Sequence, residues 1–189
     1  MLTIGLVMLQ GARREHAMAL QEVVKEFDFK MVIKELRKSA DVEGIDGLIL
    51  PGGETTAMNI ASQSEELLST LWQYLEAKNI PVLATCAGAI LLSQNNLIRA
   101  TIERNAYGGQ LHSFQTMIQT TIGEGEFPGV FIRAPAFKSF ECEQVASLNT
   151  EPIGLLDGNK MALTFHPELT KDLRFHRWLL TSALKTKGL

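Results

Sequence analysis

The chain has 189 residues, 46% of them hydrophobic and 21% charged, which is typical of one soluble globular domain with a sizeable core. The net charge of −3 and the lack of any basic run argue against nucleic acid or an anionic membrane surface as a partner. The two cysteines form no close-spaced disulfide or zinc pattern, the N-terminus has no leader, and no apolar run is long enough to cross a membrane, so we expect a single cytoplasmic domain over residues 1–189.

Strand-like and helix-like segments alternate in the first half of the chain. The predicted order is a strand over 3–9, a helix over 13–27, strands over 29–33 and 47–50, and an amphipathic helix that includes Leu67 and Leu75. Ser62 and Glu65 are predicted to form a capping box ahead of this helix. The segment 81–92 then predicts a buried strand, a turn of small residues and a further helix.

The second half of the chain has a different pattern. Short strands separated by Gly, Pro and Asn are predicted over 117–122, 130–133, 153–156 and 161–165, followed by a last helix from about residue 170. The first half therefore predicts βαβ units on a parallel sheet, to which the second half adds antiparallel strands. The predicted fold class is α/β, with ligands bound at the carboxyl ends of the strands.

Cys86 lies at the predicted turn between a strand and a helix. There, backbone N–H groups and the positive end of the helix dipole favour a thiolate and a developing oxyanion. The nucleophilic serine of the α/β-hydrolases occupies a similar elbow. The alternative is a buried cysteine that fills space as a small hydrophobic residue.

His166 is the histidine best placed to serve a cysteine nucleophile. It follows the predicted strand 161–165, and Glu168 lies two residues further on, on the same side of an extended segment that Pro167 would hold. The carboxylate would orient the imidazole as in other nucleophilic triads, although a turn with a solvated pair is the simpler alternative. We expect His16 and His176, in helical patterns, to lie at the surface, and His112 to line either a site or a loop.

Gly52 and Gly53 follow the predicted strand 47–50. Two glycines allow the backbone to approach a ligand and to point N–H groups at it, which suits an oxyanion hole, whereas the alternative is a turn that only ends the strand. The Walker lysine and spacing are absent, so this is not a phosphate loop.

Taken together, the motifs resemble those of class I (triad-type) glutamine amidotransferases, and more narrowly of the PdxT/SNO family, the glutaminase subunits of pyridoxal 5′-phosphate synthase. The motifs are LQGA at 9–12, REH at 14–16, LPGGETT at 50–56, TCAG at 85–88, RNAYG at 104–108, VFIRAP at 130–135 and FHPELT at 165–170. The resemblance covers essentially the whole chain. It implies a three-layer, flavodoxin-like fold with a mixed, mostly parallel sheet flanked by helices.

The resemblance also implies roles for individual residues in the hydrolysis of L-glutamine to L-glutamate and ammonia through a cysteine thioester. By position, Cys86 would be the nucleophile, His166 the base and Glu168 its orienting group. Gly53 and Ala87 would form the oxyanion hole, and Gln10 and Gly11 a switch coupled to the partner. The glutamine-binding residues would be Gly52, Gly53, Glu54, Arg104, Ile132 and Arg133. No cofactor or metal is implied. The implied partner is a (β/α)₈-barrel synthase subunit, in a large hetero-oligomer on a dodecameric core, which would receive the ammonia.

Three positions depart from the pattern of this family. Gly109 replaces an arginine, Gln115 replaces a glutamate, and Ala84 replaces a glycine before the Thr-Cys pair. None of them removes a proposed triad member, but the first two put partner docking in doubt. Two alternatives follow: the same hydrolysis for another ammonia acceptor, against which the motifs at 104–108 and 132–135 argue, and a non-catalytic regulatory subunit, against which the intact triad argues.

Overall fold

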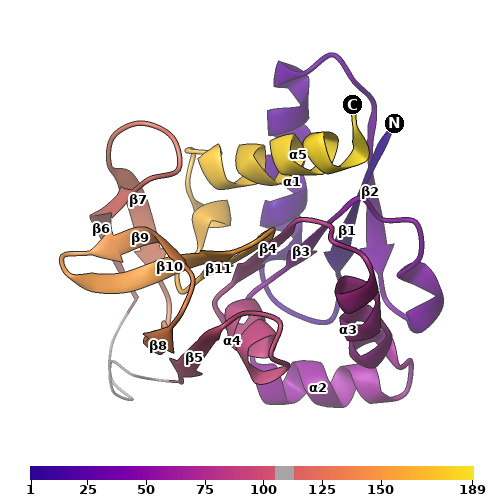
Figure 1. Ribbon diagram of the computed structural model, residues 1–189, viewed down its shortest axis with the longest axis horizontal. Coiled ribbons are helices and arrows are strands. Elements are labelled where there is room, and N and C mark those ends of the chain that lie inside the picture. Colours follow the sequence, from indigo (N-terminus) through magenta and orange to yellow (C-terminus); the bar gives the residue numbers. More distant parts are fainter. Residues whose placement is uncertain (105–112) are drawn as a thin grey trace.

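The computed structural model describes residues 1–104 and 113–189. Within them, eleven strands are found: β1 (Leu2–Val7), β2 (Met31–Leu36), β3 (Gly47–Leu50), β4 (Val82–Thr85), β5 (Ala100–Glu103), β6 (Phe114–Thr120), β7 (Phe127–Phe131), β8 (Ala136–Phe140), β9 (Glu143–Leu148), β10 (Glu151–Asp157) and β11 (Lys160–Leu163). The α-helices are α1 (Arg13–Val23), α2 (Thr55–Gln63), α3 (Leu67–Ala77), α4 (Ala87–Gln94) and α5 (Arg174–Lys187). Figure 1 shows their arrangement.

Nine of the described strands form one mixed sheet in the order β2-β1-β3-β4-β11-β10-β9-β6-β7. Strands β2, β1, β3, β4 and β11 run parallel to one another, and β10, β9, β6 and β7 continue the sheet with antiparallel pairing. Strands β5 and β8 form a separate antiparallel pair. The predicted combination of a parallel half and an antiparallel extension is confirmed.

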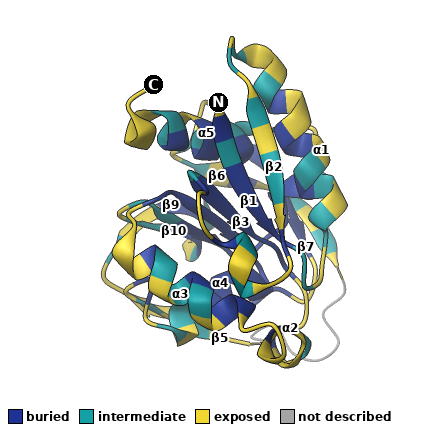
Figure 2. Ribbon diagram, turned by 90° about the vertical axis from the view of Figure 1, so that its right-hand side faces the viewer, coloured by how far each residue is buried: buried dark blue, intermediate teal, exposed yellow. Residues whose placement is uncertain are grey.

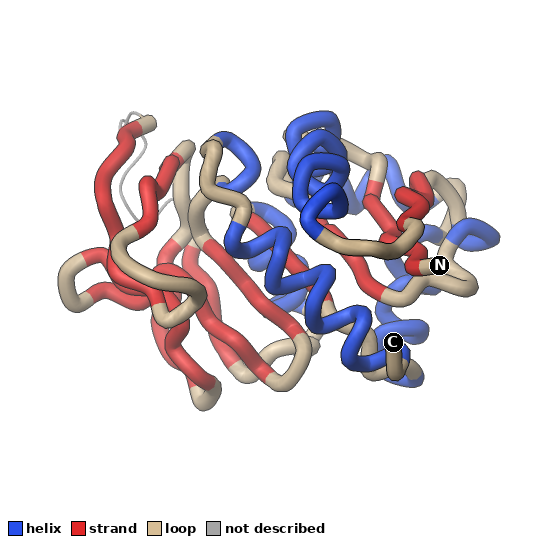
Figure 3. Tube along the Cα trace, turned by 90° about the horizontal axis from the view of Figure 1, so that it is seen from above, coloured by secondary structure: helices blue, strands red, loops and turns tan. Residues whose placement is uncertain are grey.

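Helices cover both faces of the parallel half and complete three layers (Figures 1 and 2). Helices α1 and α5 lie on one face, and α2, α3 and α4 lie on the other; Figure 3 shows α5 running across the strands to the C-terminus. Because side chains alternate along a strand, Leu48 and Leu50 pack into the core beneath α3, whereas Ile49 packs into the core beneath α5. A strand buried on both faces has a continuous apolar sequence, as GLIL in β3 does.

A cluster of four phenylalanines fixes the segment that carries His166. The rings of Phe127, Phe131, Phe165 and Phe175 are all buried and contact one another at centroid distances of 4.9–5.9 Å. The backbone N–H of His166 donates to the carbonyl of Val130 at 2.8 Å. The chain beyond β11 is therefore held firmly on both sides of the histidine.

Some local predictions are wrong. Ser62 does not begin a capping box, because it lies inside α2, a helix that the pattern did not indicate; α3 begins after Glu66, whose φ is 50° and whose side chain makes no cap. Strands β5, β8 and β9 were also not predicted. Helix α1 ends at Val23 and continues as a 3-10 turn, Val24–Glu26. In the described residues, no helix is long and apolar enough to cross a membrane.

Candidate active site

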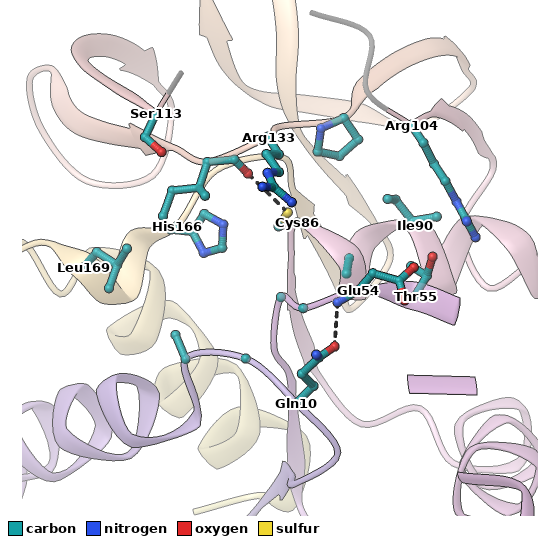
Figure 4. A pocket seen from close by; sticks show the side chains of 17 residues that line it. Gln10, Glu54, Thr55, Cys86, Ile90, Arg104, Ser113, Arg133, His166 and Leu169 are labelled. Atoms are coloured by element: carbon teal, nitrogen blue, oxygen red, sulfur yellow. Dashed lines mark hydrogen bonds between the residues drawn. The ribbon is translucent and has the colours of Figure 1, made fainter. Parts of the chain in front are cut away.

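The carboxyl ends of four parallel strands meet at one pocket of about 750 Å³ (Figure 4). Because β1, β3, β4 and β11 run in the same direction, the segments that follow them reach the same edge of the sheet. The predicted residues that line this pocket are Gln10, Gly11, Gly52, Gly53, Glu54, Cys86, Ala87, Arg104, Ile132, Arg133 and His166. Glu168 lies behind His166 and does not line it.

Cys86 forms a strained elbow between β4 and α4. Its φ of 47° and ψ of −109° lie far from the usual regions for a non-glycine residue, and its backbone N–H donates to the carbonyl of Leu163 at 2.8 Å. The residue is only 8% exposed, yet it lines the pocket, with Sγ 3.9 Å from the carbonyl oxygen of Ile132. The geometry therefore presents the thiol to the pocket at the N-terminus of α4.

His166 and Glu168 form the predicted pair. Nδ1 of His166 lies 2.7 Å from Oε1 of Glu168, and both side chains are buried. The predicted reason is wrong, because Pro167 does not hold an extended strand: it opens a 3-10 turn, Pro167–Leu169, directly after His166. Proline is favoured at such a first position because it has no N–H to leave unpaired.

The charge on the pair is set by its neighbours. Burial lowers the pKa of His166, but its interactions with Cys86 and with the carboxylate of Glu168 outweigh burial and raise the pKa to about 10. Burial raises the pKa of Glu168, but His16 and His166 outweigh it and lower that pKa. At neutral pH the pair is thus an imidazolium held by a carboxylate, and Nε2 of the imidazolium has no hydrogen-bond partner among the described residues.

Gly52 brings the nucleophile and the histidine together. A Cβ at this position would lie 2.8 Å from Cε1 of His166 and 3.2 Å from Cβ of Cys86. Only a glycine therefore allows the loop after β3 to fit between these two side chains. The N–H of Gly52 donates to Oγ1 of Thr85 at 3.1 Å, which ties this loop to the end of β4.

The loop after β1 is fastened to the same glycine loop. Oε1 of Gln10 accepts a hydrogen bond from the backbone N–H of Glu54 at 2.7 Å (Figure 4). Gly11 has a φ of +88°, and a Cβ there would lie 1.8 Å from the carbonyl oxygen of Gly52. The two loops are therefore in direct contact, through one hydrogen bond and one close approach of the backbones.

The carboxylate of Glu54 caps helix α2. Its two oxygens accept hydrogen bonds from the N–H groups of Thr56 at 2.9 Å and Ala57 at 2.7 Å. These bonds lower the pKa of Glu54, and the nearby charge of Arg104 adds to the effect. Glu54 thus remains an anion at the pocket wall. Arg104, after β5, and Arg133, with a φ of 46°, supply cationic groups.

Two expectations about histidines are wrong. His16 and His176 are fully buried, because each is part of the apolar face of its helix. His16 repeats with Ala19, Leu20 and Val23, and His176 with Leu179, Leu180 and Ala183, at the i, i+3, i+4, i+7 spacing of a core face. That spacing is the signal in the sequence that could have identified them.

Other residues of the site were not predicted. Thr85 is fully buried beneath the glycine loop, and Ala12, Thr55, Ile90, Ser113, Pro135 and Leu169 also line the pocket. Of the departures from the family pattern, Ala84 is buried in β4 and Gln115 is exposed on β6, whereas Gly109, like His112, lies outside the described residues. Over residues 1–104 and 113–189, no group of three or more His, Cys, Asp or Glu side chains is placed to hold a metal ion.

The fold is that of the class I glutamine amidotransferases. A solved structure described as a glutamine amidotransferase matches 98% of this chain and 99% of its own, with a TM-score of 0.81 and 34% identity. The glutaminase domain of the Trypanosoma brucei CTPS with bound acivicin shares the fold at a TM-score of 0.63 and 14% identity, covering 98% of this chain and 94% of that one.

The sequence comparisons narrow this class to one family. The model of the SNO glutamine amidotransferase family matches residues 6–185. The pyridoxal 5′-phosphate synthase subunit PdxT of Thermotoga petrophila is 38% identical, over 94% of this chain and 97% of its own length. That of Thermococcus gammatolerans is 34% identical, over 97% of this chain and 100% of its own length. The chain belongs to the SNO glutamine amidotransferase family.

Proposed function

We propose that this protein hydrolyses L-glutamine and supplies the ammonia to a synthase that makes pyridoxal 5′-phosphate. The observation that carries the proposal is the position of Cys86, with His166 and Glu168 behind it, in the pocket of a chain that belongs to this amidotransferase family. The relatives are named as subunits of pyridoxal 5′-phosphate synthase, and this supports that synthase as the acceptor of the ammonia. The reduced cytoplasm is the compartment we assign to this chemistry.

The reaction proceeds through a thioester on Cys86. The thiolate attacks the side-chain amide carbon of glutamine, and the new C–S bond gives a tetrahedral oxyanion. His166, protonated at neutral pH, donates its Nε2 proton to the leaving nitrogen, the C–N bond breaks and ammonia departs. Water then attacks the thioester and gives its proton back to His166, and the C–S bond breaks to release glutamate and restore the thiolate. Glu168 holds the imidazole in place throughout.

The remaining pocket residues stabilise the oxyanion and hold the substrate. The backbone N–H groups of Gly53 and Ala87 form the oxyanion hole, and one such donor contributes roughly 3 kcal/mol to transition-state stabilisation. The α-ammonium group of glutamine pairs with Glu54, and its α-carboxylate pairs with an arginine, Arg104 or Arg133. Gly52 and Ile132 shape the channel for the side-chain amide.

The partner is the synthase subunit, of (β/α)₈-barrel type, and the full assembly is built on a dodecameric core of that subunit. Gln10 and Gly11 form the switch that docking acts on. The support for this assignment is the hydrogen bond from Glu54 to Gln10 and the close fit of Gly11 on Gly52, through which a shift of the β1 loop reaches the glycine loop. The glutaminase activity is accordingly low until the synthase docks.

Glutamate release tests the proposal. We expect glutamate to form from glutamine in the presence of the synthase subunit, little without it, and none with Cys86→Ala in either condition. Cys142→Ala is the matched control, because this second thiol lies outside the pocket. Full activity without the synthase would contradict the switch, and unchanged activity of Cys86→Ala would contradict the nucleophile.

A further inference from the structure

A second pair of histidines lies directly behind the triad and takes no part in the reaction described above. Nε2 of His16 lies 3.4 Å from Oε2 of Glu168 and 3.3 Å from Oγ1 of Thr85. Nδ1 of His16 lies 2.9 Å from Nε2 of His176, and both imidazoles are fully buried. A buried polar group is costly unless it is paired, so this row of side chains requires an explanation.

The surroundings select one arrangement of protons. Burial lowers the pKa of His16 more than the charge of Glu168 raises it, and burial also lowers the pKa of His176, so both imidazoles are neutral at pH 7. The carboxylate of Glu168, 3.4 Å from Nε2 of His16, favours a proton on that nitrogen, because a lone pair there would face the carboxylate. Nδ1 of His16 is then an acceptor, and His176 must donate to it from Nε2.

An independent observation leads to the same arrangement. Nδ1 of His176 is buried and has no hydrogen-bond partner among the described residues. With the proton of His176 on Nε2, this orphan atom is an unprotonated acceptor rather than a buried N–H. The opposite arrangement would leave an unpaired donor in the core, in addition to the clash of lone pairs at Glu168.

We propose that His16, anchored by His176, is a positioning residue that directs its Nε2–H at the second carboxylate oxygen of Glu168. Oε1 of Glu168 is bonded to His166, whereas Oε2 makes no hydrogen bond of ordinary length within the described residues and has Nε2 of His16 3.4 Å away. Nε2 of His16 lies 3.4 Å from Oε2 and 3.3 Å from Oγ1 of Thr85, so its N–H attracts Oε2 and restrains rotation of the carboxylate away from His166. This inference rests on the proposed glutaminase function.

The position of His16 gives this contact a second consequence. His16 lies in the first turn and a half of α1, which follows the Gln10–Gly11 loop, and its N–H donates to the carbonyl of Ala12 at 3.1 Å. Oγ1 of Thr85, which His16 also faces, accepts a hydrogen bond from the N–H of Gly52. The same imidazole therefore contacts the orienting carboxylate of the triad and the support of the glycine loop.

Two amide substitutions separate positioning from mere packing. In His16→Gln the side-chain nitrogen can take the place of Nε2 and still donate to Glu168, whereas the shorter side chain of His16→Asn cannot reach it. With the synthase present, we expect His16→Asn to lower kcat roughly tenfold with KM within about twofold of wild type, and His16→Gln to keep most of kcat. Leu20→Ala, a fully buried change on the same helix, controls for lost stability and should leave kcat of the folded enzyme unchanged.

A double-mutant cycle with Glu168→Gln completes the test. If His16 acts through the carboxylate, His16→Asn should lower kcat no further in the Glu168→Gln background. An equal loss in both backgrounds, equal losses for the Asn and Gln variants, or wild-type kcat for His16→Asn would each overturn the positioning role. Absence of glutamate release by the wild-type complex would instead refute the glutaminase function, so the two failures are distinguishable.

Discussion

Gly52→Ala places one methyl group between the nucleophile and the histidine. The new Cβ would lie 2.8 Å from Cε1 of His166 and 3.2 Å from Cβ of Cys86, whereas carbon atoms in contact are normally about 3.5–4.0 Å apart. Gly52 does not have a positive φ, so alanine introduces no backbone strain of its own. The substitution therefore acts through the side chains that it touches.

The expected effect is on the rate rather than on binding. Cys86 is fixed by its elbow, and His166 is held by Val130 and Glu168, so the imidazole or the loop must retreat by roughly 1 Å. A misplacement of this size costs about 10²-fold in rate. We expect kcat for glutamate release, with the synthase present, to fall about 100-fold.

Gly154→Ala is the matched control for this experiment. A Cβ there meets Cβ of Ala146 and Cδ2 of Leu163, both at 2.9 Å, on β10 and away from the pocket. Overpacking should lower the free energy of unfolding by roughly 1–3 kcal/mol and leave kcat of the folded enzyme intact. Wild-type kcat for Gly52→Ala, or an equal loss of kcat in the two variants, would refute the reasoning.

Three further predictions concern the supports of the site. Thr85→Val leaves the buried N–H of Gly52 unpaired and should lower the free energy of unfolding by about 1–3 kcal/mol, whereas Thr85→Ser keeps the acceptor. Equal stability of the Val and Ser variants in denaturant titrations would contradict this role of Thr85. Glu54→Ala removes the cap of α2, which should lower the thermal midpoint of unfolding, and removes an anion of the pocket, which should raise KM for glutamine. An unchanged KM would show that Glu54 does not bind substrate. The pKa of His166 rises from 6.5 to about 10 on folding, so its contribution to stability is complete below pH 6.5 and is lost as the pH rises through 10. The difference in unfolding free energy between wild type and His166→Gln should therefore shrink over that range. A constant difference would be inconsistent with the raised pKa.

The sequence predicts those parts of the molecule that local patterns determine. The apolar run before Cys86 and the GLIL segment are long enough to define β4 and β3, and the parallel half of the sheet follows from their alternation with helices. Among the described residues, β5 and β8 pair with each other apart from the nine-stranded sheet and bury almost none of their side chains, so little in their own sequence distinguishes them from loops. Their structure depends on contacts between distant residues.

The site shows the same division. The glycine loop, Cys86 and the His166–Glu168 pair can be found from residue type and spacing, whereas the conformation that joins that pair is a 3-10 turn rather than a strand. The helical patterns around His16 and His176 lead us to expect them at the surface, although their spacing follows the apolar faces of their helices. Their contact spans 160 positions in the chain and depends on the packing of α1 against α5.

The thioester on Cys86 can be measured directly. The complex with the synthase is acid-quenched during turnover of glutamine, digested and mapped by mass spectrometry. We predict a glutamyl group on the peptide that contains Cys86, absent from the peptide with Cys142 and absent altogether in Cys86→Ala. Steady glutamate release with no adduct on Cys86, or release that persists in Cys86→Ala, would contradict the account.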